Sequence, residues 1–132
     1  FKQYHQLKLA TDIAVPGDKF KELFDFYNSN LYPLTPKLFF IKFGHIGDNH
    51  LHVNLVARER KDFPLAQELV LKFVRKAVSL DGTVSAEHGI GKIKHDYLSI
   101  MYGKAGLKEM VRLKRHFDPA LILDRDNIFS LR

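Results

Sequence analysis

The stretch of this sequence richest in chemistry is an eleven-residue run that holds three histidines. It reads Gly-His-Ile-Gly-Asp-Asn-His-Leu-His-Val-Asn, from position 44 to position 54. If the glycine and aspartate in its middle form a two-residue hairpin turn, His45 pairs with His50, and His52 lies diagonal to His45 on the same face, roughly 7–8 Å away. Two imidazoles at that spacing can bind one cation, whereas a loop one residue longer would turn His45 to the opposite face. The alternative interpretation is a polar strand that faces solvent.

A second run, Ser-Ala-Glu-His-Gly-Ile-Gly-Lys, occupies positions 85 to 92. Glu87 could supply a carboxylate ligand, and His88 could act as a base because an imidazole changes its protonation near neutral pH. Adjacent residues on a regular strand point to opposite faces, so both could serve one site only if the backbone is irregular. Gly89 and Gly91 would allow such a backbone. The alternative here is a connection between a strand and a helix that carries a surface charge pair.

Composition limits the chemistry that these two runs can perform. The chain has no cysteine, which excludes disulfides, thiolate ligands and a thiol nucleophile. Imidazole nitrogens and carboxylate oxygens suit a divalent metal such as zinc, manganese or iron without selecting among them. No dinucleotide fingerprint, phosphate loop or nucleophile elbow is found. The net charge of +6 comes from lysines and arginines spread along the chain, which favours anionic ligands over nucleic acid.

The elements that must position these residues follow from apolar periodicity and turn residues in a chain of 132 residues, a length typical of one domain. We expect a helix that Asp18 caps, and a second helix that begins after Asp62 and that Gly82 caps. Strands are expected over 7–15, 37–43, 50–56 and 83–87, with helices over 20–31 and 64–80, helical pieces over 94–102 and 104–117, and a docked apolar tail over 121–129.

This order predicts an α+β fold, a ferredoxin-like antiparallel sheet with helices on one face and a C-terminal helical extension. The other face of the sheet would then carry no helix. A bare sheet face of that size usually marks a partner.

Taken together, the two runs resemble the C-terminal domain of FAD-linked oxidases related to glycolate oxidase, D-lactate dehydrogenase and D-2-hydroxyglutarate dehydrogenase. In that family Gly-His-x-Gly-Asp-Gly-Asn-Leu-His-x-Asn is followed by Ser-x-Glu-His-Gly-Ile-Gly. Shorter segments match as well, so the resemblance covers nearly the whole chain. They are Asp12–Pro16, Asp96–Leu98, Phe117–Pro119 and Asn127–Phe129.

The resemblance implies that residues 1–132 form a substrate domain and that FAD is held mainly by an N-terminal domain that this chain lacks. It implies that His45, His52 and Glu87 bind a divalent metal. It also implies that His88 is the catalytic base and that Asn54 contacts the substrate.

One departure from the family pattern falls within the hairpin, where Asn49-His50 replaces the usual Gly-Asn. Asn49 still tolerates the positive φ that a turn requires. His50 adds a ligand or a substrate contact, and we assign it, with Asn54, to substrate binding.

The function implied is oxidation of a small D-2-hydroxy acid (glycolate, D-lactate or similar) to the 2-oxo acid. The cation would lower the pKa of the substrate hydroxyl, His88 would take its proton, and the α-hydrogen would pass as hydride to the flavin. The partners expected are the hydroxy acid, the FAD-binding domain of the same polypeptide, an electron acceptor that the sequence does not identify and, as an option, a second copy in a homodimer. We expect a cytoplasmic protein, either free or at the membrane periphery, and an isolated chain that is catalytically inert.

Two other functions remain open at this point. Two histidines and a glutamate with an open position are also the usual metal ligands of a metal-dependent hydrolase. A ferredoxin-like fold can also serve as a non-enzymatic binding module, in which the histidines are incidental.

Overall fold

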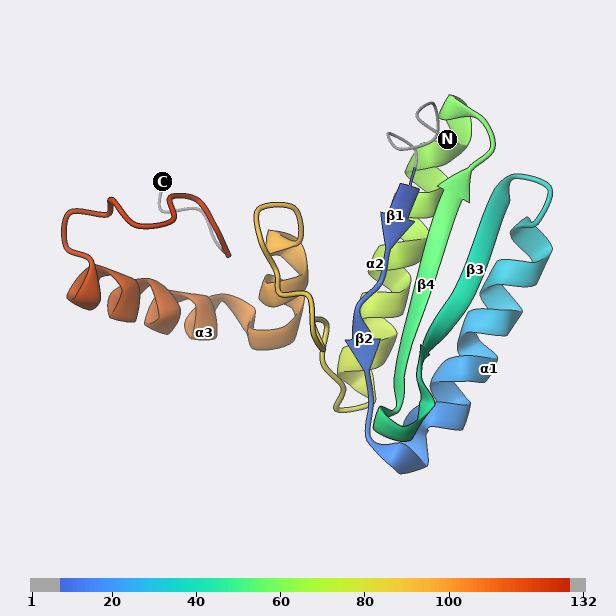
Figure 1. Ribbon diagram of the computed structural model, residues 1–132, viewed down its shortest axis with the longest axis horizontal. Helices are drawn as coiled ribbons and strands as arrows, with labels where there is room; N and C mark the ends of the chain where they lie inside the picture. Colours follow the sequence, from blue (N-terminus) through green and yellow to red (C-terminus); the bar gives the residue numbers. More distant parts are fainter. Residues whose placement is uncertain (1–7, 129–132) are drawn as a thin grey trace. The chain divides into compact units, whose positions relative to one another are not determined.

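The computed structural model describes residues 8–128, and these fall into two compact units that are divided in the sequence between Glu87 and His88. The first unit holds the sheet and two helices, and the second holds one interrupted helix (Figure 1). The strands are β1 (Lys8–Ala10), β2 (Ile13–Ala14), β3 (Leu38–His45) and β4 (His50–Ala57), and the helices are α1 (Phe20–Leu31), α2 (Phe63–Ser79) and α3 (His95–Phe117).

β4 is the centre of the sheet, and every strand pairs with it in the antiparallel sense. β3 lies along one side of β4, while β1 and β2 follow each other along the other side (Figure 1). The segment after α2 reaches β2 through an isolated bridge between Ala14 and Thr83. Across the sheet, the chain segments therefore follow the ferredoxin-like order, and the predicted fold class is confirmed.

The fourth strand, expected over 83–87, is wrong in detail, because only Thr83 makes a bridge and the chain then bends. The bend is fixed by Asp12, whose carbonyl accepts the backbone N–H of Ala86 and whose carboxylate accepts that of Glu87. The expected first strand, 7–15, is likewise divided into β1 and β2, with Thr11 and Asp12 between them. Its first residue, Leu7, lies outside the described residues.

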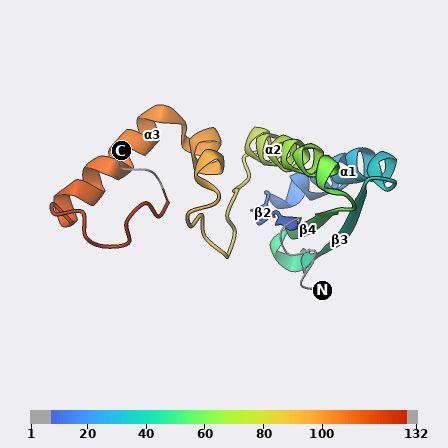
Figure 2. The same ribbon diagram turned by 90° about the horizontal axis from the view of Figure 1, so that it is seen from above.

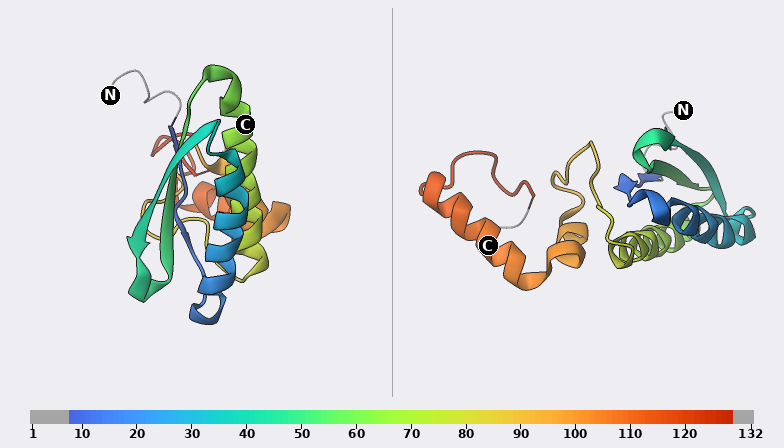
Figure 3. Two further views of the ribbon diagram at one scale, coloured as in Figure 1. Left: turned by 90° about the vertical axis from the view of Figure 1, so that its right-hand side faces the viewer. Right: turned by 90° about the horizontal axis from the view of Figure 1, so that it is seen from below.

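Both helices of the first unit cover the same face of the sheet (Figure 2, Figure 3). Tyr27 of α1 and Phe73 of α2 are fully buried and their ring centroids lie 4.4 Å apart. Burying a side chain of this size contributes roughly 1.5–3 kcal/mol. Because side chains alternate along a strand, burial of the β4 residues beneath the helices turns its histidines to the opposite, open face. The buried apolar residues of β4 are Leu51, Val53, Leu55 and Ala57.

The helix ends differ from those expected. Asp18 lies within a short 3₁₀ turn and makes no cap, and Asp62 stands at the N-cap position without a side-chain hydrogen bond. After α2 the left-handed residue is Asp81, with φ of 58°, and not Gly82. Gly82 is needed for a different reason, since a Cβ there would lie 2.6 Å from the carbonyl oxygen of Ala14. The chain after α2 therefore passes against β2 with no room for a side chain.

The second unit consists of α3 and the segment that follows it. The helix is interrupted at Gly103, with φ of 65° and ψ of 179°, which confirms the two helical pieces expected there. After the helix, Asp118 accepts the backbone N–H groups of Ile122 and Leu123, which fixes the chain reversal. Of the tail expected over 121–129, Phe129 lies outside the described residues. Among residues 8–128, no helix combines the length and the apolar character that a membrane crossing requires.

Candidate metal centre

The histidine hairpin has the register that its sequence predicts. His45 is directly opposite His50, and the turn closes with the N–H of Asn49 donating to the carbonyl of Ile46 at 3.2 Å. Asn49 has φ of 52°, as expected for the residue at the family's glycine position. The ring centroids of His45 and His50 are 5.7 Å apart, and those of His50 and His52 are 4.2 Å apart. All three imidazoles therefore gather on the open face of the sheet.

The break between β1 and β2 supplies an acceptor for His52. In the ladder, Thr11 faces Val53 and donates its N–H to the carbonyl of Val53 at 3.0 Å. In a regular ladder the Thr11 carbonyl would accept the N–H of Val53 in return. Here that N–H donates instead to the Thr11 hydroxyl at 2.9 Å. The carbonyl of Thr11 is turned aside, where it accepts from Nδ1 of His52 at 3.0 Å. The side chain thus completes the sheet and releases a backbone oxygen to orient an imidazole.

That bond determines which nitrogen of His52 faces the site. A carbonyl oxygen can only accept, so Nδ1 carries the proton and Nε2 of a neutral ring carries the lone pair. Nε2 lies 2.9 Å from Oε1 of Glu87. A lone pair and a carboxylate oxygen repel at this distance unless a positive charge lies between them. A proton or a metal ion can provide that charge.

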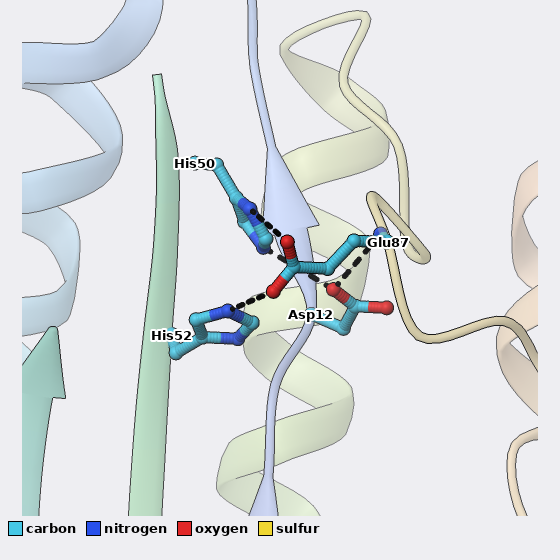
Figure 4. Close-up of side chains that lie close together, drawn as sticks. All are labelled: Asp12, His50, His52 and Glu87. Carbon is cyan, nitrogen blue, oxygen red and sulfur yellow. Dashed lines mark hydrogen bonds and ion pairs between the residues drawn. The ribbon is translucent and has the colours of Figure 1, made fainter. Parts of the chain in front are cut away.

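Asp12 lies between β1 and β2 and connects β4 with the segment that carries Glu87 (Figure 4). The carboxylate is 2% exposed, so its partners must come from the protein. It accepts from Nε2 of His50 at 3.2 Å, from the hydroxyl of Ser85 at 3.1 Å and from the backbone N–H of Glu87 at 3.3 Å. Sequence reasoning used Asp12 only as part of a matching strand and missed this role. The available signal was a lone carboxylate at the start of an apolar strand.

The described residues contain a four-residue group with the composition of a metal site. One ligand atom from each of Asp12, His50, His52 and Glu87 lies within 4.8 Å of the others. His45 stands at the edge of this group, with Nε2 3.6 Å from Oε2 of Glu87 and a side chain that is 60% exposed. The structure thus brings His52 and Glu87 together, keeps His45 next to Glu87, and adds two residues. The group is open to solvent on the side of Glu87 and His45.

Asn54 and His88, the other residues expected in the site, each lie close in sequence to a residue of this group. Asn54 is half-buried on β4, two residues beyond His52 and on the same face. His88 is exposed and begins the second unit, and its assignment as a base stays a prediction. Gly89 and Gly91 both have positive φ, which confirms the irregular backbone expected around the Glu-His pair.

Next to the histidines the open face is apolar. Three residues that alternate along β3 share this face with His45, and we call them the β3 stripe: Phe39, Ile41 and Phe43, which are 49%, 50% and 49% exposed. Phe43 also contacts the site, since its ring centroid is 5.0 Å from that of His52.

Comparison with known proteins places this geometry in a family context. A family model described as "FAD linked oxidases, C-terminal domain" matches residues 1–128. The chain is 32% identical over 121 residues to the mitochondrial D-lactate dehydrogenase [cytochrome] 1 of Saccharomyces cerevisiae, covering 92% of this chain and 20% of that protein. It is 36% identical over 130 residues to the D-2-hydroxyglutarate dehydrogenase of Stutzerimonas stutzeri, covering 96% of this chain and 28% of that protein. It is 34% identical over 90 residues to the glycolate oxidase subunit GlcD of Bacillus subtilis, covering 67% and 19%. The chain therefore spans between 19% and 28% of the length of these relatives.

Proposed function

The chain belongs to the family of FAD-linked oxidase C-terminal domains, and on that premise we propose that it is the substrate- and metal-binding part of a flavin-dependent 2-hydroxyacid dehydrogenase. The substrate would be a small D-2-hydroxy acid, and the product the corresponding 2-oxo acid. The relatives named above support this class, since they are D-lactate and D-2-hydroxyglutarate dehydrogenases and a glycolate oxidase subunit.

The observation that carries the proposal is the contact between Nε2 of His52 and Oε1 of Glu87 at 2.9 Å. The donor set of imidazole nitrogen and carboxylate oxygen fits a divalent metal. We propose that His45, His52 and Glu87 hold this ion. When bound, it supplies Lewis-acid chemistry that lowers the pKa of a coordinated hydroxyl group.

The remaining residues would act on the substrate. We propose that His88 accepts the proton of the substrate hydroxyl and that Asn54, on the same face as the metal ligands, donates or accepts a hydrogen bond to the substrate. FAD supplies the acceptor for the hydride, and it would be bound by another part of the same polypeptide.

The β3 stripe supports an FAD-binding part as the partner of the open face. Its three large apolar side chains, each about half exposed, lie along β3 on the same face as the three histidines, and Phe43 contacts His52. An apolar patch beside polar chemistry is typical of an interface that closes over a site. We propose that the FAD-binding part covers this patch and brings the flavin to the metal centre.

The proposal is tested in the polypeptide that contains both parts. Without oxygen, glycolate, D-lactate or D-2-hydroxyglutarate should bleach the flavin absorbance, and removal of metal by a chelator should stop the bleaching. His88→Gln should bind FAD and metal normally but reduce the flavin at least about a hundredfold more slowly, the range for loss of a general base. His116→Gln, at an exposed histidine of α3, is the matched control and should behave as the wild type. Absence of bleaching with every 2-hydroxy acid would overturn the function, and normal rates in His88→Gln would overturn the assignment of the base.

A further inference from the structure

His50 is the histidine that the family pattern does not contain, and, like His52, it is a buried imidazole of the hairpin. It is 4% exposed although it lies on the open face of the sheet. Its Nε2 lies 3.2 Å from Oδ1 of Asp12. A carboxylate can only accept, so Nε2 carries the proton and the lone pair of the neutral ring is on Nδ1.

Nδ1 is also the atom of His50 that faces the metal centre. It lies 3.9 Å from Oε2 of Glu87, and Nε2 of His45 lies 3.6 Å from the same oxygen. Ligand atoms that are each about 2.1 Å from one ion are roughly 3–4 Å apart, so both separations suit neighbours in one coordination shell. An orienting carboxylate on the far nitrogen is the usual arrangement behind a metal-bound histidine.

We infer that His50 binds the metal through Nδ1 as an additional protein ligand, and that Asp12 is the positioning residue that holds it. This inference rests on the metal centre proposed above and deepens it. It replaces the expectation that His50 contacts the substrate, because a ring that is almost fully buried, with one nitrogen on Asp12, has only Nδ1 to offer. Asp12 has a second effect, since the same oxygen accepts the backbone N–H of Glu87 at 3.3 Å and so fixes two ligands relative to each other.

The test uses the purified protein, stripped of metal and titrated with Co²⁺, with two independent measurements. The first is the dissociation constant for Co²⁺. The second is the number of paramagnetically shifted ¹H NMR signals that disappear in D₂O, because each metal-bound histidine with a protected N–H contributes one. The N–H groups of His50 and His52 are both buried and hydrogen-bonded, so each should give a signal.

His50→Asn is the decisive variant, since an asparagine amide can still donate to Asp12. It should weaken Co²⁺ binding more than tenfold, because loss of an outer-shell partner alone costs about 10–100-fold. It should also lose one exchangeable shifted signal. Asp12→Asn should weaken binding by about 10–100-fold while both signals remain. His116→Asn is the control and should match the wild type in both measurements.

The outcomes separate this inference from the proposed function. If the wild type binds no Co²⁺, the metal centre itself is wrong, and the inference fails with it. If the wild type binds Co²⁺, His52→Asn abolishes binding and His50→Asn keeps the wild-type affinity and signal number, only the inference is overturned. Thermal unfolding of each metal-free variant shows whether it is folded. If His50→Asn is unfolded, His50→Gln replaces it and is read by the same criteria.

Discussion

Thr11 accepts the N–H of Val53 through its hydroxyl and Nδ1 of His52 through its carbonyl, and replacing it by valine should separate these two roles. Valine has nearly the same shape but no hydroxyl, so the N–H of Val53, in a residue with 0% exposure, loses its acceptor at 2.9 Å. If the backbone stays in place, a buried unsatisfied donor costs about 1–3 kcal/mol of unfolding free energy. If the Thr11 carbonyl instead turns back into the ladder, the strand is repaired but Nδ1 of His52 loses its partner at 3.0 Å. Loss of such a partner weakens metal binding by about 10–100-fold.

The two costs are alternatives, so Thr11→Val must show one of them. Urea unfolding of the metal-free protein measures the first, and titration with Co²⁺ measures the second. Thr11→Ser is the matched control, since it keeps the hydroxyl and should lose only about 0.8 kcal/mol for the missing methyl group, with unchanged metal affinity. A Thr11→Val protein with both wild-type stability and wild-type affinity would refute the description of the strand break.

Three further changes test the frame around the site. Phe73→Ala removes a fully buried ring from the helix layer and should lower the unfolding free energy by about 3–5 kcal/mol in urea titrations. Gly82→Ala places a methyl group 2.6 Å from the Ala14 carbonyl, so the chain must shift, which should lower stability by about 1–3 kcal/mol and weaken Co²⁺ binding as the loop to the site moves. The ammonium group of Lys114 and two backbone N–H groups hold the pKa of Asp118 below its ordinary value of 3.8. Because the folded pKa is the lower one, this stabilisation is complete above pH 3.8 and is lost as the pH falls through the folded pKa. The hydrogen-exchange protection factors of amides at the end of α3 should therefore fall in that acid range, and Asp118→Asn should remove this pH dependence.

The parts of the fold that follow a local period could be predicted from the sequence. In β4, alternation alone places Leu51 and Val53 beneath the helices and His52 on the open face. The hairpin register was predictable only on the condition that the turn is centred on Gly47 and Asp48, which places His45 opposite His50. The contact between His52 and Glu87, which lie 35 positions apart, was expected only from the family resemblance.

The parts that could not be predicted depend on contacts between distant segments. Residues 8–15 have the composition of one continuous strand, and at the break the Thr11 carbonyl accepts a hydrogen bond from His52, a residue 41 positions away. The carboxylate of Asp12 accepts from donors at positions 50, 85 and 87, none of which is a neighbour in sequence. The segment after Thr83 has the composition of a strand, yet it bends because Asp12 binds its backbone. In each case a tertiary hydrogen bond overrides local propensity.

The position of β3 in the sheet has a practical consequence for work with this chain. Among the described residues β3 pairs only with β4, so its other edge offers a row of unused backbone donors and acceptors. Long, exposed apolar edge strands are templates for pairing with a second molecule. Here the edge belongs to the same strand that carries the β3 stripe. Preparations that lack a covering partner should therefore form oligomers as protein concentration rises, and a lysine introduced at Ile41 should keep them monomeric.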